Sequence, residues 1–281
     1  MEEFTGNCRS IEDCNRQYRM LWEKYKRKAS LPKKFSEYLK FWPQQYPAEK
    51  MKNGGILFIS LNPAFNKYVK TLLTIKSTRD LSDPCIVNCV VEEHRSALSP
   101  DKEGKLYSYY EELRKIAIIV KKDINWCNLD LIPIRGSNQS DVIDALKLKL
   151  DHKAERNVKE FLQDSTKIAT SMIDIINPSV VVVVNGFIRD LIEDCFIDHK
   201  HEENCSLVKN LDIVNRKKSR KDNELQIRVR GSYRPLILFK MLSGRHPIKK
   251  KEKEVLVQQI KTKIKKAEKF LGQQEEQPSP V

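Results

Sequence analysis

An amide, a proline and an aromatic ring follow the first strongly apolar run of the sequence. The run covers residues 56–61, and Asn62, Pro63 and Phe65 come directly after it. An amide can donate and accept hydrogen bonds at the same time, and an aromatic ring offers a flat face for stacking. Together these groups suit a planar heterocycle with a polar edge.

Further polar side chains follow two other apolar runs. Arg245 and His246 come after the last run, residues 236–241, and a protonated or neutral imidazole can donate a hydrogen bond to an oxygen that gains negative charge. Asn128 lies inside an earlier run, and Arg135 follows that run. Open parallel sheets bind ligands beyond the carboxyl ends of their strands. We therefore expect these side chains to gather at one edge of a sheet.

Short apolar runs predict the strands of that sheet, at residues 56–61, 124–132, 180–184 and 236–241. The third run consists of valine only, which is typical of a central parallel strand with helices on both faces. Stretches with helical periodicity separate the runs, as parallel pairing requires. The expected helices are 10–28, 34–41, 107–120, 154–176, 187–196 and 256–271. The predicted fold class is α/β, with three layers (α/β/α) around a central, mainly parallel four-stranded sheet.

The expected domain organisation has one α/β domain at residues 51–271. A helical segment at residues 1–50 precedes it and is expected to pack on it. A basic stretch interrupts the pattern at about residues 199–230 and is predicted to form a hairpin. The tail, residues 272–281, is rich in Gln, Glu and Pro and is expected to be disordered.

The composition favours a protein that binds a polyanion. The net charge is +14 at pH 7, and nucleic acid is the first partner to expect for so basic a chain. We expect DNA, single- or double-stranded, as the partner of a monomer. No apolar stretch reaches the roughly 18 residues of a membrane helix, so no membrane partner is expected.

The N-terminal residues have neither the basic nor the apolar region of a secretory signal. We therefore expect an intracellular location, in the cytoplasm or nucleoid, or in the nucleus of a eukaryote. The chain has seven cysteines, an odd number scattered along the sequence, and we expect all of them to be reduced thiols. Cys8 with Cys14, and Cys85 with Cys89, lack the close spacing of a metal-binding pair, so no metal ion or other cofactor is expected.

Two of the motifs resemble those of the uracil-DNA glycosylase superfamily. Leu61-Asn62-Pro63 is similar to the family's Gly-x-Asp/Asn-Pro motif after the first core strand, and Gly244-Arg-His246-Pro247 is similar to its His-Pro-Ser or Asn-Pro-Ser motif after the last. The family also has a strand-borne asparagine between the two, which Asn128 matches. The resemblance covers residues 54–263, and the order and placement of the motifs give it its weight.

The resemblance implies a role for each matching residue. Asn62 matches the position that orients the attacking water, and Phe65 is the candidate for the ring that stacks on the flipped base. Asn128 matches the amide that reads the edge of the base. Pro63 is expected to contact the base as well. His246 matches the residue that hydrogen-bonds the base carbonyl and stabilises negative charge as the glycosidic bond breaks.

The chain departs from the family pattern at three positions. Ser60 and Ala64 stand where glycines are usual, and Ile248 stands where a serine normally contacts phosphate. Two alternatives follow for the second motif: Lys249 and Lys250 supply the phosphate contact instead, or Ile248 fills the space that the flipped base leaves.

The first motif also lacks an aspartate, so a strong general base is missing from it. Asp130 lies two residues after Asn128 and on the same face of the expected strand, which makes it the reserve candidate for that base. Arg135 and Arg245 are candidates for contacts with the nucleic-acid backbone, because both follow strands at the same edge.

These residues lead to a hypothesis of a monofunctional, metal-free DNA glycosylase that hydrolyses the N-glycosidic bond of uracil or a related deaminated base. The alternative is a protein of the same fold that has lost catalysis and binds nucleic acid or a protein partner without base release. A third class, an enzyme acting on free nucleosides, fits the charge less well. Taken singly, Asn62-Pro63 also fits a strand terminator, Phe65 a core residue, His246 a surface histidine and Asn128 a structural amide.

Overall fold

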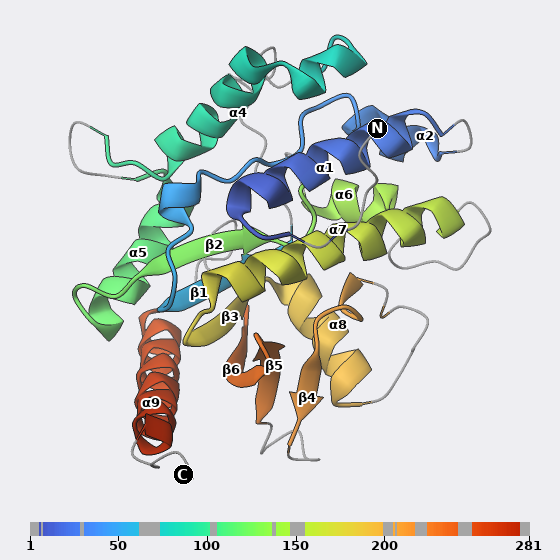
Figure 1. Cartoon of the computed structure of the whole chain (residues 1–281). Helices are drawn as coiled ribbons and strands as arrows, with labels where there is room; N and C mark the ends of the chain where they lie inside the picture. The colour runs from blue at the N-terminus through green and yellow to red at the C-terminus, as the bar shows by residue number, and fades with distance from the viewer. Residues whose placement is uncertain are drawn as a thin grey trace, which may run out of the picture.

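Six strands form one mixed β-sheet at the centre of the protein (Figure 1). The computed structural model describes residues 6, 8–28, 31–61, 74–101, 106–136, 139–146, 155–198, 205, 207–216, 224–240 and 249–275. The strand order is β2-β1-β3-β6-β5-β4. The strands are β1 (Ile56–Ser60), β2 (Trp126–Asp130), β3 (Val180–Val184), β4 (Ile213–Asn215), β5 (Leu225–Val229) and β6 (Ser232–Phe239).

The parallel part of the sheet consists of the four predicted strands. β1 pairs with β2 and β3, and β3 pairs with β6, all in parallel. The expected number of strands is wrong, because β5 pairs antiparallel with β6 and β4 pairs antiparallel with β5. The basic stretch thus contains a hairpin as expected, but its strands extend the central sheet. Buried Leu225, Ile227 and Val229 alternate with more exposed residues in β5, the period of a half-buried strand.

Helices cover both faces of the parallel strands. The α-helices are α1 (Ile11–Lys26), α2 (Lys33–Tyr38), α4 (Pro84–Ala97), α5 (Ser108–Val120), α6 (Gln139–Ala145), α7 (Glu155–Ile176), α8 (Gly186–Phe196) and α9 (Lys250–Glu275), with short 3-10 helices η1 (Ala48–Lys50) and η3 (Thr78–Ser82). α1 lies along α7 (Figure 1), and both share one apolar cluster with α8. α5 and α9 form a second cluster with the opposite face of β1 and β3.

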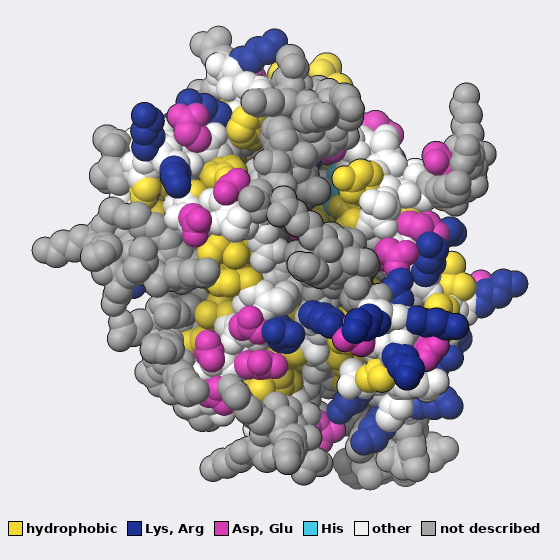
Figure 2. Space-filling model, turned by 180° about the vertical axis from the view of Figure 1, so that it is seen from behind, with side chains coloured by type: hydrophobic (Ala, Val, Ile, Leu, Met, Phe, Trp, Pro, Cys, Tyr) yellow, Lys and Arg dark blue, Asp and Glu magenta, His cyan; other side chains and the backbone are white. Residues whose placement is uncertain are grey.

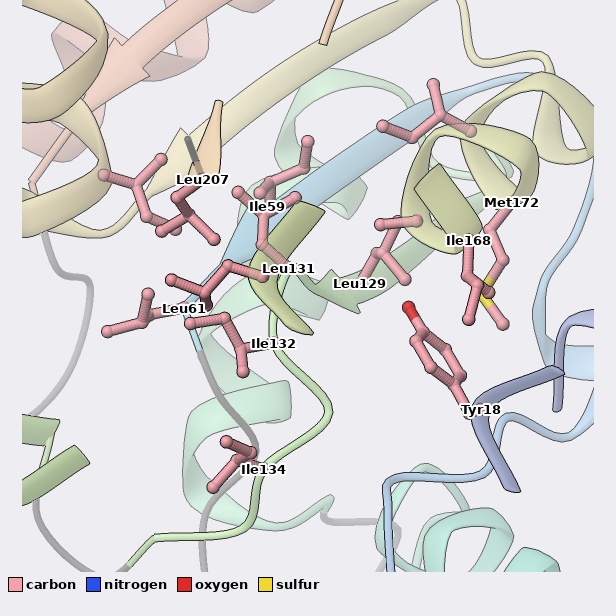
Figure 3. Packing of buried hydrophobic residues seen from close by; sticks show 14 of the residues in the cluster. Tyr18, Ile59, Leu61, Leu129, Leu131, Ile132, Ile134, Ile168, Met172 and Leu207 are labelled. Carbon is pink, nitrogen blue, oxygen red and sulfur yellow. The ribbon is translucent and has the colours of Figure 1, made fainter. Parts of the chain in front are cut away.

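Alternation along the strands separates these two clusters. Leu57, Ile59 and Leu129 face the cluster of α1 and α7, whereas Ile56 and Phe58 face that of α5 and α9. Figure 3 shows the first cluster, in which Ile59, Leu61, Leu129 and Leu131 lie together, with Tyr18, Ile168 and Met172 around Leu129. The face of β2 toward α7 is therefore fully apolar.

Two helices begin at sequence signals for capping. Ser10 precedes α1, and its hydroxyl accepts a hydrogen bond from the Asp13 amide, as the sequence pattern predicts. Asp83 precedes α4, where its carboxylate accepts from the amides of Cys85 and Ile86 and Pro84 occupies the first helical position. The helix α4 is absent from the sequence-based expectation, although the Asp-Pro pair is a recognisable start.

Cys195 and Cys205 form a disulfide, so the expectation that all cysteines are reduced is wrong for this pair. Their Cα atoms lie 6.0 Å apart, a separation that a disulfide can bridge. Sequence spacing alone does not reveal that these two cysteines lie so close in space. Among the described residues, Cys8, Cys14, Cys85, Cys89 and Cys127 are free thiols.

Gly55 occupies a tight position at the start of β1. Its φ is +72°, and an added Cβ would lie 2.0 Å from the carbonyl oxygen of Asn125. We expect Gly55→Ala to lower the free energy of unfolding by about 2–5 kcal/mol, from left-handed strain and overpacking. Gly54 is the matched control: its φ is +76° with nothing within 4 Å, so Gly54→Ala should cost only about 1–2 kcal/mol. Urea denaturation of both variants measures the difference, and equal losses would contradict the steric argument.

Within the described residues, no helix combines the length and apolarity needed to cross a membrane.

Candidate functional site

A buried polar group lies where β1 and β2 end. The parallel register sets Ser60 of β1 beside Asp130 of β2, and Asn128 two residues earlier points to the same face. Asn128 and Asp130 are each 2% exposed and Ser60 is 8% exposed. This face is the one toward α5, the face opposite to the apolar cluster of Figure 3. The carboxyl edge of the sheet thus holds polar side chains, as the sequence predicts for Asn128.

Hydrogen bonds join these three side chains to Tyr109 of α5. The Ser60 hydroxyl lies 2.6 Å from Asp130 Oδ1 and 3.1 Å from Asn128 Oδ1. A hydroxyl has one proton, and the shorter contact to a carboxylate identifies Asp130 as its acceptor. The Tyr109 hydroxyl donates to Asn128 Oδ1 at 3.3 Å. The oxygen of the Asn128 amide is therefore occupied from within the protein.

Two atoms of this group have no hydrogen-bonding partner in the described part of the chain. They are the amide nitrogen of Asn128, Nδ2, and the second carboxylate oxygen of Asp130, Oδ2. Buried polar atoms are almost always paired, so the unpaired donor and the unpaired acceptor of this group mark a place for water or a polar ligand. The Asn128 amide is nevertheless near enough to Asp130 to stabilise its charged form.

The pKa of Asp130 is raised from 3.8 to about 6, because burial disfavours the charged carboxylate. The Ser60 hydroxyl, the charge of Arg135 and the Asn128 amide oppose this rise. Asp130 is thus ionised at neutral pH and protonated in mild acid.

His94 of α4 forms the second part of the polar group. It is 2% exposed, and its Nδ1 lies 2.9 Å from the carbonyl oxygen of Gln45. A carbonyl only accepts, so Nδ1 carries the proton, and the Tyr110 hydroxyl donates to Nε2 at 3.3 Å. Burial lowers the pKa of His94 to about 3, with a further contribution from Arg135, so the ring is neutral.

Tyr46 connects His94 to the end of β2. The Tyr46 ring packs edge-on against the His94 ring, with centroids 5.4 Å apart. The hydroxyl of Tyr46 accepts from the Asp130 backbone amide at 3.1 Å and donates to the Asp130 carbonyl at 3.4 Å. The segment before η1 thereby fixes the backbone that positions the Asp130 carboxylate.

Arg135 is buried beside Glu93 of α4. Arg135 is 3% exposed, and its Nη2 lies 3.0 Å from Glu93 Oε2. A DNA phosphate would have to reach a buried guanidinium that already faces a carboxylate. The position of Arg135 therefore gives no support to the predicted backbone contact. Its positive charge lowers the pKa of Asp130 and of His94.

The lysines predicted to contact phosphate lie at the start of α9. Lys249 and Lys250 are both exposed, and Lys251 beside them is exposed as well. Figure 2 shows Lys and Arg side chains gathered at the lower right, where α9 lies in that view. The phosphate contact itself stays a prediction.

The remaining predicted site residues lie outside the described residues: Asn62, Pro63, Phe65, Arg245 and His246. β1 ends at Ser60, and the described residues that follow it end at Leu61, one residue before Asn62. The expectation that Asn62 and His246 face each other over a shared cavity therefore stays a prediction.

Asn185 follows β3 at the same edge of the sheet, and its side chain has a structural role. Its side chain caps α8 by accepting from the Ile188 amide at 3.1 Å and exchanges two hydrogen bonds with Gln139 of α6. Unlike Asn128, Asn185 uses both ends of its amide within the protein.

Sequence reasoning missed His94, Tyr46 and Tyr109 as members of the polar group. Tyr109 stands in a predicted helix, but nothing in its spacing distinguishes it from Tyr107 or Tyr110. The sequence predicts Asp130 on the same face as Asn128, and that placement is confirmed.

The described residues also form pockets away from the polar group, and they lack a metal-binding cluster. A surface hollow of about 1120 Å³ lies between α9 and β6, lined by Leu236, Val255 and Lys263 among others, and none of Ser60, Asn128 and Asp130 lines it. No three His, Cys, Asp or Glu side chains in the described ranges lie close enough together to hold a metal ion.

Comparisons of the chain with protein-family models, with curated proteins and with solved structures give no significant match.

Proposed function

We propose that this protein is a DNA base-excision glycosylase that hydrolyses the N-glycosidic bond of uracil or a related deaminated base. One observation carries the proposal: the buried Asn128 amide has an unpaired nitrogen at the carboxyl end of a parallel strand, beside the strand that leads to Asn62. Helices on both faces of the sheet support a three-layer, glycosylase-like fold.

The chemistry follows from what a base inside a duplex requires. An enzyme must extrude the base, stack it and read its hydrogen-bonding edge. Asn128 offers a fixed donor for a carbonyl of that base. As the glycosidic bond breaks, negative charge develops on the base oxygens, and a preorganised donor stabilises the transition state more than the ground state. Water orientation by Asn62, stacking on Phe65 and oxyanion stabilisation by His246 complete the proposed mechanism.

The charge of the chain supports a DNA substrate. The net charge is +14, and exposed lysines at 249, 250 and 251 begin α9. A helix N-terminus with neighbouring lysines attracts phosphate through its free amides and its dipole.

A base-release assay tests the proposal. Oligonucleotides with a single uracil, hypoxanthine or xanthine, in single- and double-stranded form, are incubated with the protein and then treated with alkali to cleave abasic sites. We expect strand scission with at least one of these bases. Asn128→Ala should slow it about 10²–10³-fold, the usual loss for one transition-state donor.

Asn125→Ala is the control, since this exposed amide lies just before β2 and bonds the Asn53 carbonyl at 3.0 Å, outside the site. Asn125→Ala should release base at the native rate. Intact strands for all three bases contradict the enzymatic proposal. Salt-sensitive DNA binding that persists without base release would instead identify a nucleic-acid-binding protein of this fold.

A further inference from the structure

A pocket lies at the amino end of β2, away from the polar group. Its volume is about 450 Å³, within the range of about 300–1,000 Å³ that is usual for sites of small ligands. Its lining comes from the chain around η1, from the turn after α4, from α5 and from the residues that lead into β2. None of Ser60, Asn128 and Asp130 lines it. The pocket is therefore a second concave place on this protein.

Trp126 supplies an aromatic ring to the pocket. The side chain is partly exposed, and its ring packs edge-on against the ring of Phe58, with centroids 6.4 Å apart. Phe58 is fully buried, so this contact restricts the orientation of the indole. Leu98 and Leu106 line the same pocket with apolar surface. A flat aromatic molecule can pack on such a lining.

The backbone of Trp126 faces the open edge of the sheet. β2 is the outermost strand, and its one strand partner in the described residues is β1. The Ile56 amide donates to the Asn125 carbonyl at 2.9 Å, and in a parallel ladder the two bonds of Ile56 fall on the residues on either side of Trp126. The N–H and C=O groups of Trp126 therefore point away from β1 and offer a ligand one donor and one acceptor.

The charged side chains of the pocket favour an anion. Three cationic side chains and one acidic side chain line it: Lys50, Lys52, Arg114 and Asp123. Glu111 engages Arg114 by accepting hydrogen bonds from its Nε and Nη2 at 2.9 Å each. Lys50 and Lys52 form no ion pair within the described part of the chain. Two ammonium groups thus stand against one carboxylate, and they attract a ligand with a negative group.

We infer that this pocket binds a nucleoside monophosphate, with the base packed on Trp126 and the phosphate held by Lys50 and Lys52. A mononucleotide has a flat heterocycle with donors and acceptors on its edge, and a phosphate monoester carries a charge of about −1.5 to −2 at pH 7. The inference goes beyond the proposed glycosylase and does not depend on it, because the pocket lies at the opposite end of the parallel strands from the carboxyl edge.

The two halves of the lining distinguish this ligand from simpler ones. Inorganic phosphate would leave the surface of Trp126, Leu98 and Leu106 uncovered. A neutral nucleoside would leave Lys50 and Lys52 without a counter-charge. A mononucleotide makes both kinds of contact and should bind more tightly than either.

Tryptophan fluorescence can report on this pocket selectively. The chain has three tryptophans, and Trp22 and Trp42 are both 0% exposed, so a quencher in solution reaches Trp126 first. Acrylamide quenching of the native protein is measured while AMP, GMP, CMP or UMP is added at constant ionic strength. We expect at least one of these nucleotides to protect Trp126. The corresponding nucleoside and inorganic phosphate should protect it at least tenfold more weakly.

Lys50→Gln combined with Lys52→Gln should weaken nucleotide binding tenfold or more and leave nucleoside binding unchanged. Lys265→Gln combined with Lys266→Gln is the matched control, since it removes the same charge from exposed lysines of α9 that do not line the pocket. It should alter neither. Calorimetric titration of Trp126→Leu should show severalfold weaker nucleotide binding. If Trp126→Leu does not fold, the exposed lysine variants decide the question.

Equal protection by nucleotides and nucleosides overturns the inference, because the lysines then take no part in binding. Absence of binding by all four nucleotides overturns it as well, whatever the base-release assay shows. A single-stranded oligonucleotide without terminal phosphates that protects Trp126 better than every mononucleotide also overturns it and identifies a nucleic-acid path. Nucleotide binding that is weakened by the Lys50 and Lys52 changes supports the pocket, and base release then bears on the proposed function alone.

Discussion

Arg135→Met is expected to lower the free energy of unfolding by about 3–5 kcal/mol, the usual loss when one partner of a buried ion pair is removed. The side chains of Arg135 and Glu93 are 2% and 14% exposed, so water replaces little of the lost interaction. Arg135 also helps to hold the pKa of Asp130 down. Its removal therefore takes the paired cation from the half-buried Glu93 and a stabilising positive charge from the buried Asp130. Urea denaturation at neutral pH measures the loss without screening charges.

A double variant separates charge from packing. Arg135→Met with Glu93→Leu removes both charges, and apolar replacement of a buried pair is often close to neutral. We expect the double variant to recover more than half of the stability that the single variant loses. A double variant as unstable as Arg135→Met would show that the guanidinium acts through its packing. Arg156→Met is the control, because its pair with Glu160 involves a side chain that is 88% exposed.

The stability of the protein should respond to pH in opposite directions at Asp130 and His94. The pKa of Asp130 is raised from 3.8 to about 6, so the folded state holds this proton more tightly than the unfolded state. Its contribution to stability is present below about pH 4 and is lost as the pH rises through 6. The pKa of His94 is lowered from 6.5 to about 3. Its contribution is present above about pH 6.5 and is lost as the pH falls through 3.

Between about pH 4 and 6 the two contributions largely cancel in the native protein. Each single variant removes one of them. We expect its free energy of unfolding, relative to that of the native protein, to change by about 1.4 kcal/mol per pH unit. Asp130→Asn should gain stability relative to the native protein as the pH rises across this window. His94→Gln should lose relative stability over the same window.

Thermal or urea unfolding at half-unit pH intervals gives both curves. The double variant should run parallel to the native protein, because it lacks both opposing contributions. Parallel curves for the native protein and either single variant would show that the pKa of that group differs little between the folded and unfolded states.

Two of the central strands, β1 and β3, were predictable because they are short, almost entirely apolar runs. Val180–Val184 and Ile56–Ser60 have five consecutive buried residues each, and burial on both faces leaves little ambiguity. β5 was missed although its alternation is regular, because the surrounding lysines and arginines dominate the local composition. α4 was missed since its apolar face is narrow, with only Val90 and His94 buried.

The site was predictable only in part, for a related reason. Asn128 and Asp130 lie on a strand, where a period of two fixes which residues share a face. Tyr46 and His94 come from a loop and an unpredicted helix, and their contact depends on chain paths that no local pattern specifies. The engagement of the Asn128 oxygen by Tyr109 depends on the rotation of α5, which periodicity gives only approximately.

The two faces of β2 differ in character. Cys127 and Leu129 lie in the apolar core, and Asn128 and Asp130 lie in the polar group on the opposite face. Deleting one residue inside this strand would exchange the two faces, forcing a carboxylate into the α7 core and a leucine into the polar group. Natural variation in chain length near this strand should therefore be confined to the turn before Trp126 or to the segment beyond Arg135. Between those limits, any insertion or deletion would also change which side chains of β2 face the polar group.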